Sequence, residues 1–187
     1  MKRREFCVLP LMLAGCGGND MAEFLIQPSP FLRTSKNVFP AGVEGNWTPG
    51  ITFATPGNLS VSFAGGGSQE GRYFRIGSLI FCFFVIATTS FTHTNASGAL
   101  QITGLPFKAR TDVGGTFAFS SGNSDWRGIT KAGYTDIQTR VIAGETFFHL
   151  ILSGSGQSRV SVSATDTPSG GDLGFIGMIS YIAEDVT

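Results

Sequence analysis

The longest apolar run of the chain extends from Leu79 to Ala87, inside the stretch RIGSLIFCFFVIATTSF. Its nine residues are too few to cross a membrane as a helix, because a spanning helix needs about 20. Phe, Val, Ile and Thr dominate the stretch, and these side chains favour a strand over a helix. The pattern therefore predicts a central strand that is buried on both faces, with part of the outer cover supplied by another subunit.

Shorter segments after Ile51 alternate apolar and polar residues and predict further strands at regular spacing. These segments are ITFA, LSVSF, RYFRIG leading into the long strand, ALQITGLPF, GGTFAFS, the hairpin DIQTRVIAGETFFHLILSG, SRVSVSA and LGFIGMISYIA. No stretch of a dozen residues shows capped helical periodicity. We therefore expect an all-β fold, an antiparallel β-sandwich of jelly-roll type with about nine strands.

The sandwich is expected to occupy residues 51–187, after an N-terminal region of different composition. Residues 21–50 are polar and contain four prolines, which predicts an extended anchoring arm without a core of its own. Within residues 1–20, the tetrad Leu-Ala-Gly-Cys ending at Cys16 resembles the lipobox of bacterial lipoprotein signals, and Arg-Arg-Glu-Phe resembles a twin-arginine export signal. If the chain is exported, Cys16 is the expected lipidation site. The alternatives are an N-terminal arm, or a translation start at Met21.

The composition narrows the class of partner. Charged residues make up 14% of the chain, which also contains 26 glycines and 17 phenylalanines. Such a chain is typical of short strands joined by tight turns, with some apolar surface covered by partner proteins. The 13 basic and 13 acidic residues are spread along the chain without a basic stripe, so we expect no nucleic-acid binding.

Residue types with chemical potential do not assemble into a recognisable catalytic or metal site. The sequence contains no nucleophile elbow and no phosphate-binding glycine loop, so we expect no enzyme activity and no cofactor. His93 and His149 lack ligands at metal-binding spacing, and Asp166 and Asp172 are too few for a calcium loop. Cys82 is expected to be a small buried hydrophobe, since the three cysteines form no disulfide or zinc pattern.

Three spaced motifs resemble a β-domain that recurs in tail fibres and related virion proteins of bacteriophages. They are Gly-Asn-Trp-Thr-Pro at 45–49, Gly-Arg-Tyr-Phe-Arg-Ile-Gly at 71–77 and Ile-Thr-Gly-Leu-Pro-Phe at 102–107. The resemblance covers roughly residues 44–182. It implies a virion structural protein of tail-fibre type, usually trimeric, that contacts the host surface. The alternatives are a capsid decoration protein or head spike, and a lipid-anchored bacterial surface lipoprotein with a fibre-like domain.

Two polar segments, His93–Gly98 and Ser121–Gly128, are expected to be exposed loops that form the contact surface. The predicted receptor-contact residues are His93, Asn95, Asp125, Trp126 and Arg127. Their expected ligand is a host surface glycan or protein. The alternative for Trp126 is a ring that caps the core, and the same alternative is favoured for Trp47.

The segment TFFHLIL is expected to serve the assembly. Alternation along a strand points Phe147 and His149 to one face and Phe148 and Leu150 to the other. Only one face can join the core of its own chain, so Phe147 and His149 are predicted to lie at the subunit interface of a homotrimer. The arm at residues 21–50 is predicted to lie across a partner subunit and to contact other virion proteins.

Overall fold

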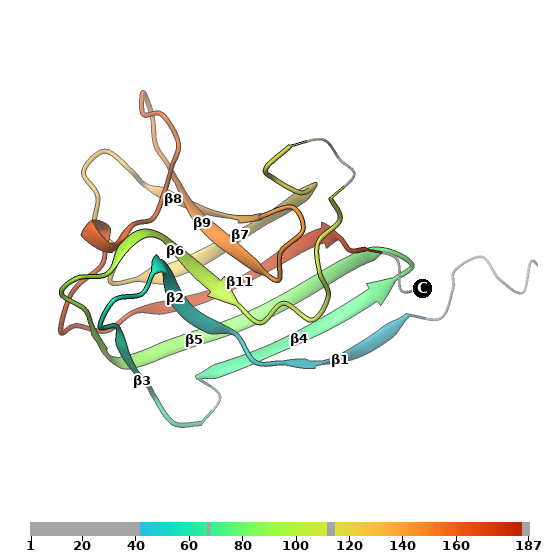
Figure 1. Cartoon of the computed structure of the whole chain (residues 1–187), viewed down its shortest axis with the longest axis horizontal. Coiled ribbons are helices and arrows are strands. Elements are labelled where there is room, and N and C mark those ends of the chain that lie inside the picture. Colours follow the sequence, from blue (N-terminus) through green and yellow to red (C-terminus); the bar gives the residue numbers. More distant parts are fainter. Residues whose placement is uncertain (1–41, 67, 112–114, 185–187) are drawn as a thin grey trace, which may run out of the picture. The chain divides into compact units, whose positions relative to one another are not determined.

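The computed structural model describes residues 42–66, 68–111 and 115–184 (Figure 1). These residues form eleven strands and one three-residue 3-10 helix, and they contain no α-helix. The elements are β1 (Val43–Trp47), β2 (Gly50–Thr55), β3 (Ser60–Phe63), β4 (Gln69–Ile76), β5 (Leu79–Thr92), β6 (Ser97–Thr103), β7 (Ser120–Arg127), β8 (Asp136–Val141), β9 (Phe147–Ser153), β10 (Val160–Ser161), η1 (Ala164–Asp166) and β11 (Gly174–Ile182). Within this part of the chain, no helix is long and apolar enough to cross a bilayer.

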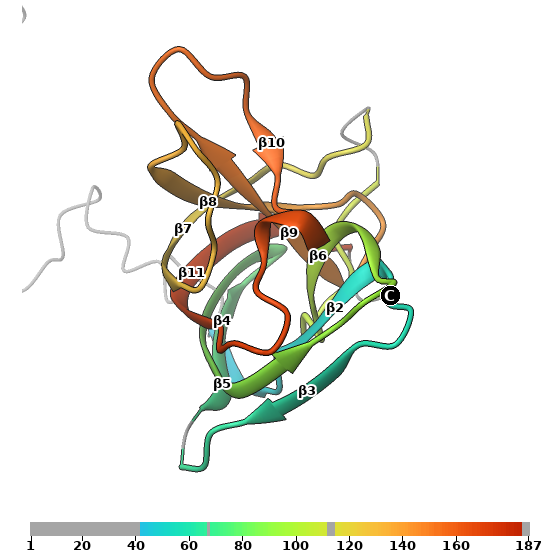
Figure 2. The same ribbon diagram turned by 90° about the vertical axis from the view of Figure 1, so that its left-hand side faces the viewer.

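All neighbouring strands pair antiparallel, in the order β1-β4-β5-β11-β7-β8-β9-β6-β2, with β3 beside β5 and β10 beside β9. The sheet curls like a half-barrel, so β2, β6 and β9 face β4, β5 and β11 across the core (Figures 1 and 2). The two layers are therefore the halves of one continuous sheet. Between them, β7 and β8 share one residue pair in register, Asn123 with Gln138. The predicted all-β antiparallel fold is confirmed.

Alternate residues of each strand fill the space between the layers, as the pleat requires. On β5 these are Ile80, Cys82, Phe84 and Ile86, all of them buried. Trp47 is also buried and meets the Phe84 ring edge-on, with 6.5 Å between the ring centroids. Trp47 therefore caps the core, as the favoured interpretation of the sequence predicted.

The outward side of β5 differs from the prediction. The strand is central, with β4 and β11 on its two sides, but the Phe83 side chain on its outer face is 52% exposed. The prediction of burial on both faces is wrong for the single chain. No other layer of the described residues covers this face, which is also the outer surface of the domain.

Three local predictions also need correction. The sheet begins at Val43, inside the segment predicted as an arm, because β1 pairs with β4 from Val43 to Trp47. Within the predicted strand GGTFAFS, residues 115–119 form one isolated bridge, between Phe117 and Ile142, and Ser120 begins β7. RYFRIG forms its own strand, β4, since Gly77 adopts a left-handed conformation (φ of 59°) and turns the chain back into β5. Cys16, the predicted export signal and residues 21–41 of the predicted arm lie outside the described residues.

Candidate functional site

One end of the domain gathers five loops, and we call it the loop end. They are residues 56–59, 93–96, 128–135, 154–159 and 167–173. The loop end is on the left of Figure 1 and faces the viewer in Figure 2. Loops carried on a rigid sheet are where proteins commonly place recognition surfaces.

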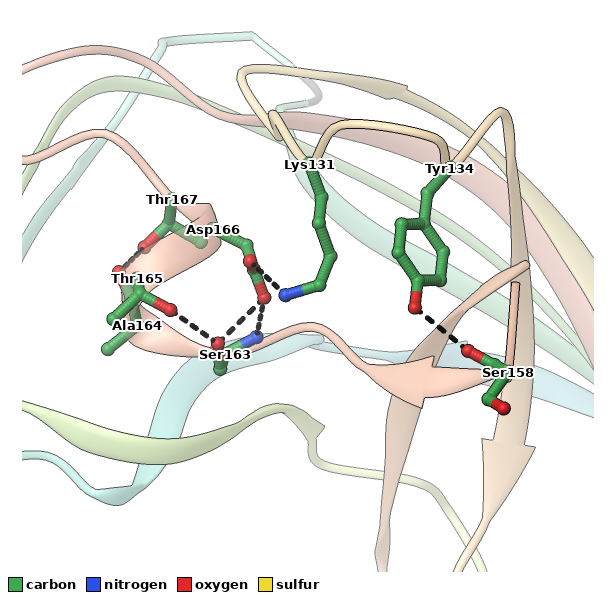
Figure 3. Close-up of polar contacts among 8 residues, drawn as sticks. All are labelled: Lys131, Tyr134, Ser158, Ser163, Ala164, Thr165, Asp166 and Thr167. Carbon is green, nitrogen blue, oxygen red and sulfur yellow. Dashed lines mark hydrogen bonds and ion pairs between the residues drawn. The ribbon is translucent and has the colours of Figure 1, made fainter. Parts of the chain in front are cut away.

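A buried carboxylate braces the loop end. Asp166, in η1, is only 6% exposed. Its Oδ1 lies 2.6 Å from Nζ of Lys131, in the loop after β7. Its Oδ2 accepts hydrogen bonds from the Ser163 backbone N–H at 2.9 Å and from the Ser163 hydroxyl at 2.7 Å (Figure 3). The side chain therefore ties the loop at 128–135 to η1.

The protonation state of Asp166 follows from these contacts. Burial alone would raise the pKa of the carboxyl, but the hydrogen bonds from Lys131 and Ser163 outweigh burial and lower the pKa. The carboxylate thus stays ionised at neutral pH and accepts hydrogen bonds from Lys131 and Ser163. The Lys131 ammonium also lies 5.8 Å from the centroid of the Tyr134 ring, and the Tyr134 hydroxyl donates to the Ser158 carbonyl at 2.9 Å. This hydrogen bond joins the loop at 154–159 to the loop at 128–135.

His93 and Asn95 lie at the loop end in different environments. His93 is 9% exposed, so its predicted exposure is wrong. Its ring packs edge-on against Phe53 and Phe91, and its Nε2 lies 3.0 Å from the Thr167 hydroxyl. Asn95 is exposed, and its side-chain oxygen accepts a hydrogen bond from the Asn58 backbone N–H at 2.8 Å. The local sequence did not indicate the burial of His93, because Phe53 and Thr167 come from distant segments.

Asp125, Trp126 and Arg127 lie in strand β7, so the predicted loop at 121–128 is wrong. Trp126 pairs with Phe175 of β11 and packs half-buried against the core. This agrees with the alternative interpretation of Trp126, a ring that caps the core. Asp125 and Arg127 are exposed, and the Arg127 guanidinium lies 2.9 Å from the Asp172 carboxylate. Receptor contact stays a prediction for all five residues, and Asn95, Asp125 and Arg127 are the exposed ones.

The faces of β9 alternate as predicted. Phe148 and Leu150 are fully buried in the core, while Phe147 and His149 point outward and are half-buried. The His149 ring lies beside Phe147, with 5.7 Å between centroids, and its backbone pairs with Arg140 of β8. Burial, followed by the nearby Arg140 charge, lowers the pKa of His149. Whether this face is a subunit interface stays a prediction.

The His149 Nε2 atom is buried and has no hydrogen-bond partner among the described residues. A polar atom in this state costs free energy unless another molecule supplies a partner. The sequence could not signal this, because the lack of a partner depends on what β6 and β8 place beside the ring. The described residues contain no group of three or more His, Cys, Asp or Glu side chains that could hold a metal ion.

Comparison with known proteins gives a likeness in fold. No protein-family description matches the chain, and no curated protein sequence does. Among solved structures, the fold is similar to part of the Dettilon tailspike protein (gp208), with a TM-score of 0.57 and 17% sequence identity. The match covers 76% of this chain and 24% of the tailspike chain, so this chain corresponds to about a quarter of that protein. The domain thus shares its fold with part of a phage tailspike.

Proposed function

We propose that this chain is a bacteriophage virion protein of tail-fibre or tailspike type, which contacts the host surface and assembles as a homotrimer. The observation that carries the proposal is the shared fold with part of a tailspike over 76% of the chain. The order of the three sequence motifs supports the same assignment. A capsid decoration protein, a head spike and a bacterial surface lipoprotein are the competing outcomes.

The loop end is the proposed host-contact surface. Its loops are held by the Lys131–Asp166 ion pair, the Tyr134–Ser158 hydrogen bond and the Asn58–Asn95 contacts. A surface that is ordered before binding loses less conformational entropy when it meets a ligand. Its exposed side chains include an amide, a guanidinium and carboxylates, which suit a polar host glycan or protein.

The location of the chain is tested by labelling purified virions with an antibody raised against the chain. Label on the tail or its fibres supports the proposal. Label spread over the head shell would assign the chain to capsid decoration or head spikes. A chain that is missing from virions and carries an acylated Cys16, as read by mass spectrometry, would be a bacterial surface lipoprotein.

The contact surface is tested by competition, in which purified chain is added to host cells before the phage. We expect the wild-type chain to reduce adsorption, and a variant with Asn95→Ala and Arg127→Ala to compete less well. The matched control is Lys108→Ala. It also removes the cation of an exposed ion pair, because Lys108 pairs with Glu184, which lies beyond the other end of β11. Equal competition by all three proteins would show that the loop end is not the contact surface.

A further inference from the structure

Two apolar patches on the outer surface of the domain are left uncovered by the described chain. The sheet patch consists of outward side chains of β4, β5 and β11: Phe74, Phe81, Phe83, Val85, Ile176 and Met178. The histidine patch consists of Phe147 and His149 of β9, Arg140 of β8, and Phe117 of the segment beside β8. Phe74, Phe83, Ile176 and Phe117 are exposed, and the other members of the two patches are half-buried. Exposed apolar surface of this kind marks contact sites.

The sheet patch combines protruding apolar side chains with hollows. Ile176 is 58% exposed and Phe83 is 52% exposed. The register places Ile176 beside Val85, and Met178 beside Phe83, so the four side chains are neighbours on one face. Ile176 borders two hollows, one shared with Phe83 and one shared with Arg127. Protruding apolar side chains next to hollows can interdigitate with a partner surface.

The border of the sheet patch is acidic. Glu70 lies next to Val85, and Asp125 lies next to Ile176, in the same cross-strand row. Glu44 lies beside Phe74. None of these three carboxylates has an ion pair within the described part of the chain. Arg72, opposite Phe83, is a cation on the same face and has no ion pair there either. Three negative charges against one positive charge leave the border at −2, since Arg127 is already paired with Asp172.

The histidine patch is basic. The Arg140 guanidinium lies over the Phe117 ring, 4.6 Å from its centroid, and has no acidic partner among the described residues. Burial, followed by the charge of Arg159, lowers the pKa of Arg140. Beside it, the buried His149 Nε2 lacks a hydrogen-bond partner. An acidic apolar surface would complement the Arg140 cation and the aromatic side chains beside it.

We propose that the sheet patch of one copy docks on the histidine patch of the next copy, in a head-to-tail contact. The two patches have complementary charge and are both apolar, and each subunit carries one of each. Packing two sheet patches together would instead bring an excess of carboxylates into contact. A head-to-tail contact can close into a ring. The inference thus rests on the homotrimer of the proposed function and names the surfaces that would build it.

Two variants of the full-length chain disable one patch each. Ile176→Glu adds an acid to the sheet patch, and Arg140→Glu removes the cation of the histidine patch. Each variant alone is expected to lower the molar mass in light scattering about threefold, from a closed ring to a single chain. Ser155→Glu, on an exposed loop outside both patches, is the matched control and should keep the wild-type mass. Circular dichroism and melting curves check that the variants stay folded.

Mixing the two variants decides between kinds of contact. The Arg140→Glu copy keeps an intact sheet patch, and the Ile176→Glu copy keeps an intact histidine patch. One good contact is therefore possible, and the mixture should give a heterodimer that grows no further. A mixture that stays monomeric, single variants that keep the wild-type mass, or a monomeric wild-type chain at micromolar concentration would each overturn the inference. The masses are measured without virions or host cells, so failure here is distinguishable from failure of the tail assignment.

Discussion

Replacing Asp166 with Asn is expected to lower the free energy of unfolding by about 3 kcal/mol at pH 7. The native carboxylate accepts from the Lys131 ammonium, the Ser163 backbone N–H and the Ser163 hydroxyl. An amide of the same shape has one oxygen in place of two. If that oxygen faces Lys131, the new NH₂ group meets the Ser163 N–H. If the amide is turned over, the NH₂ group meets the ammonium.

The magnitude follows from this mismatch. Leaving a buried donor unsatisfied costs about 1–3 kcal/mol, and breaking a buried ion pair costs about 3–5 kcal/mol. The Lys131 side chain is 31% exposed, so solvent screens part of the interaction and favours the lower end of the second range. A loss of about 3 kcal/mol corresponds to a melting temperature lower by about 10 °C for a domain of this size.

The effect should depend on pH with a definite sign. Since the folded-state pKa of Asp166 is lowered, its contribution is present above the unfolded pKa of about 3.9 and is lost as pH falls through the lower folded value. Urea titrations at several pH values, followed by circular dichroism, measure the difference between wild type and variant. Asp172→Asn is the control, because it removes an exposed carboxylate in an ion pair worth at most about 1 kcal/mol. Equal stability of wild type and Asp166→Asn at pH 7, or a difference that persists unchanged at pH 2, would refute the reasoning.

Three further variants probe the packing. Gly122→Ala should cost about 1–3 kcal/mol in urea titrations, because a Cβ there would collide with the Met178 carbonyl oxygen and the Thr139 hydroxyl; unchanged stability would contradict the close approach of β7 to β11. Trp126→Ala should cost about 2–4 kcal/mol, since the indole packs half-buried against the core, and an unchanged melting temperature would show that it does not. Burial raises the pKa of Cys82 to about 12. In a chain with serine at the other two cysteine positions, this thiol should therefore resist a disulfide reagent at pH 8 until urea unfolds the protein. Rapid labelling of the native chain would contradict its burial.

Strands with large alternating side chains were predictable from sequence, and strand β7 was not. The hairpin of β8 and β9 follows directly from the alternation in TRVIAGETFFHLIL. In β7, the inward positions are Ser120, Gly122, Ser124 and Trp126, and just one of them is large. Gly122 is small because β11 and β8 approach too closely for a side chain. A strand whose inward face is shaped by close backbone approach leaves almost no hydrophobic signal, and its polar residues then resemble a loop.

His93 shows a second limit of local pattern. Its neighbours Thr92, Thr94 and Asn95 are polar, which is typical of an exposed turn. Its burial comes from Phe53, which precedes it by 40 positions, and from Thr167, which follows it by 74. Contacts at such separations are set by the curl of the sheet, and a window of neighbouring residues does not contain them.

The outer face of the sheet offers a comparison within one surface. On β7, the outward residues Ser121, Asn123 and Asp125 are polar, as expected for a strand that meets water. On β5, which β11 separates from β7, the outward residues Phe81, Phe83 and Val85 are apolar, although the described chain leaves this face uncovered. The folding of one copy does not require large apolar side chains at these outward positions. A contact made after folding would bury them. The exposed outer face of β5 and the unpaired carboxylates beside it therefore indicate the same contact surface.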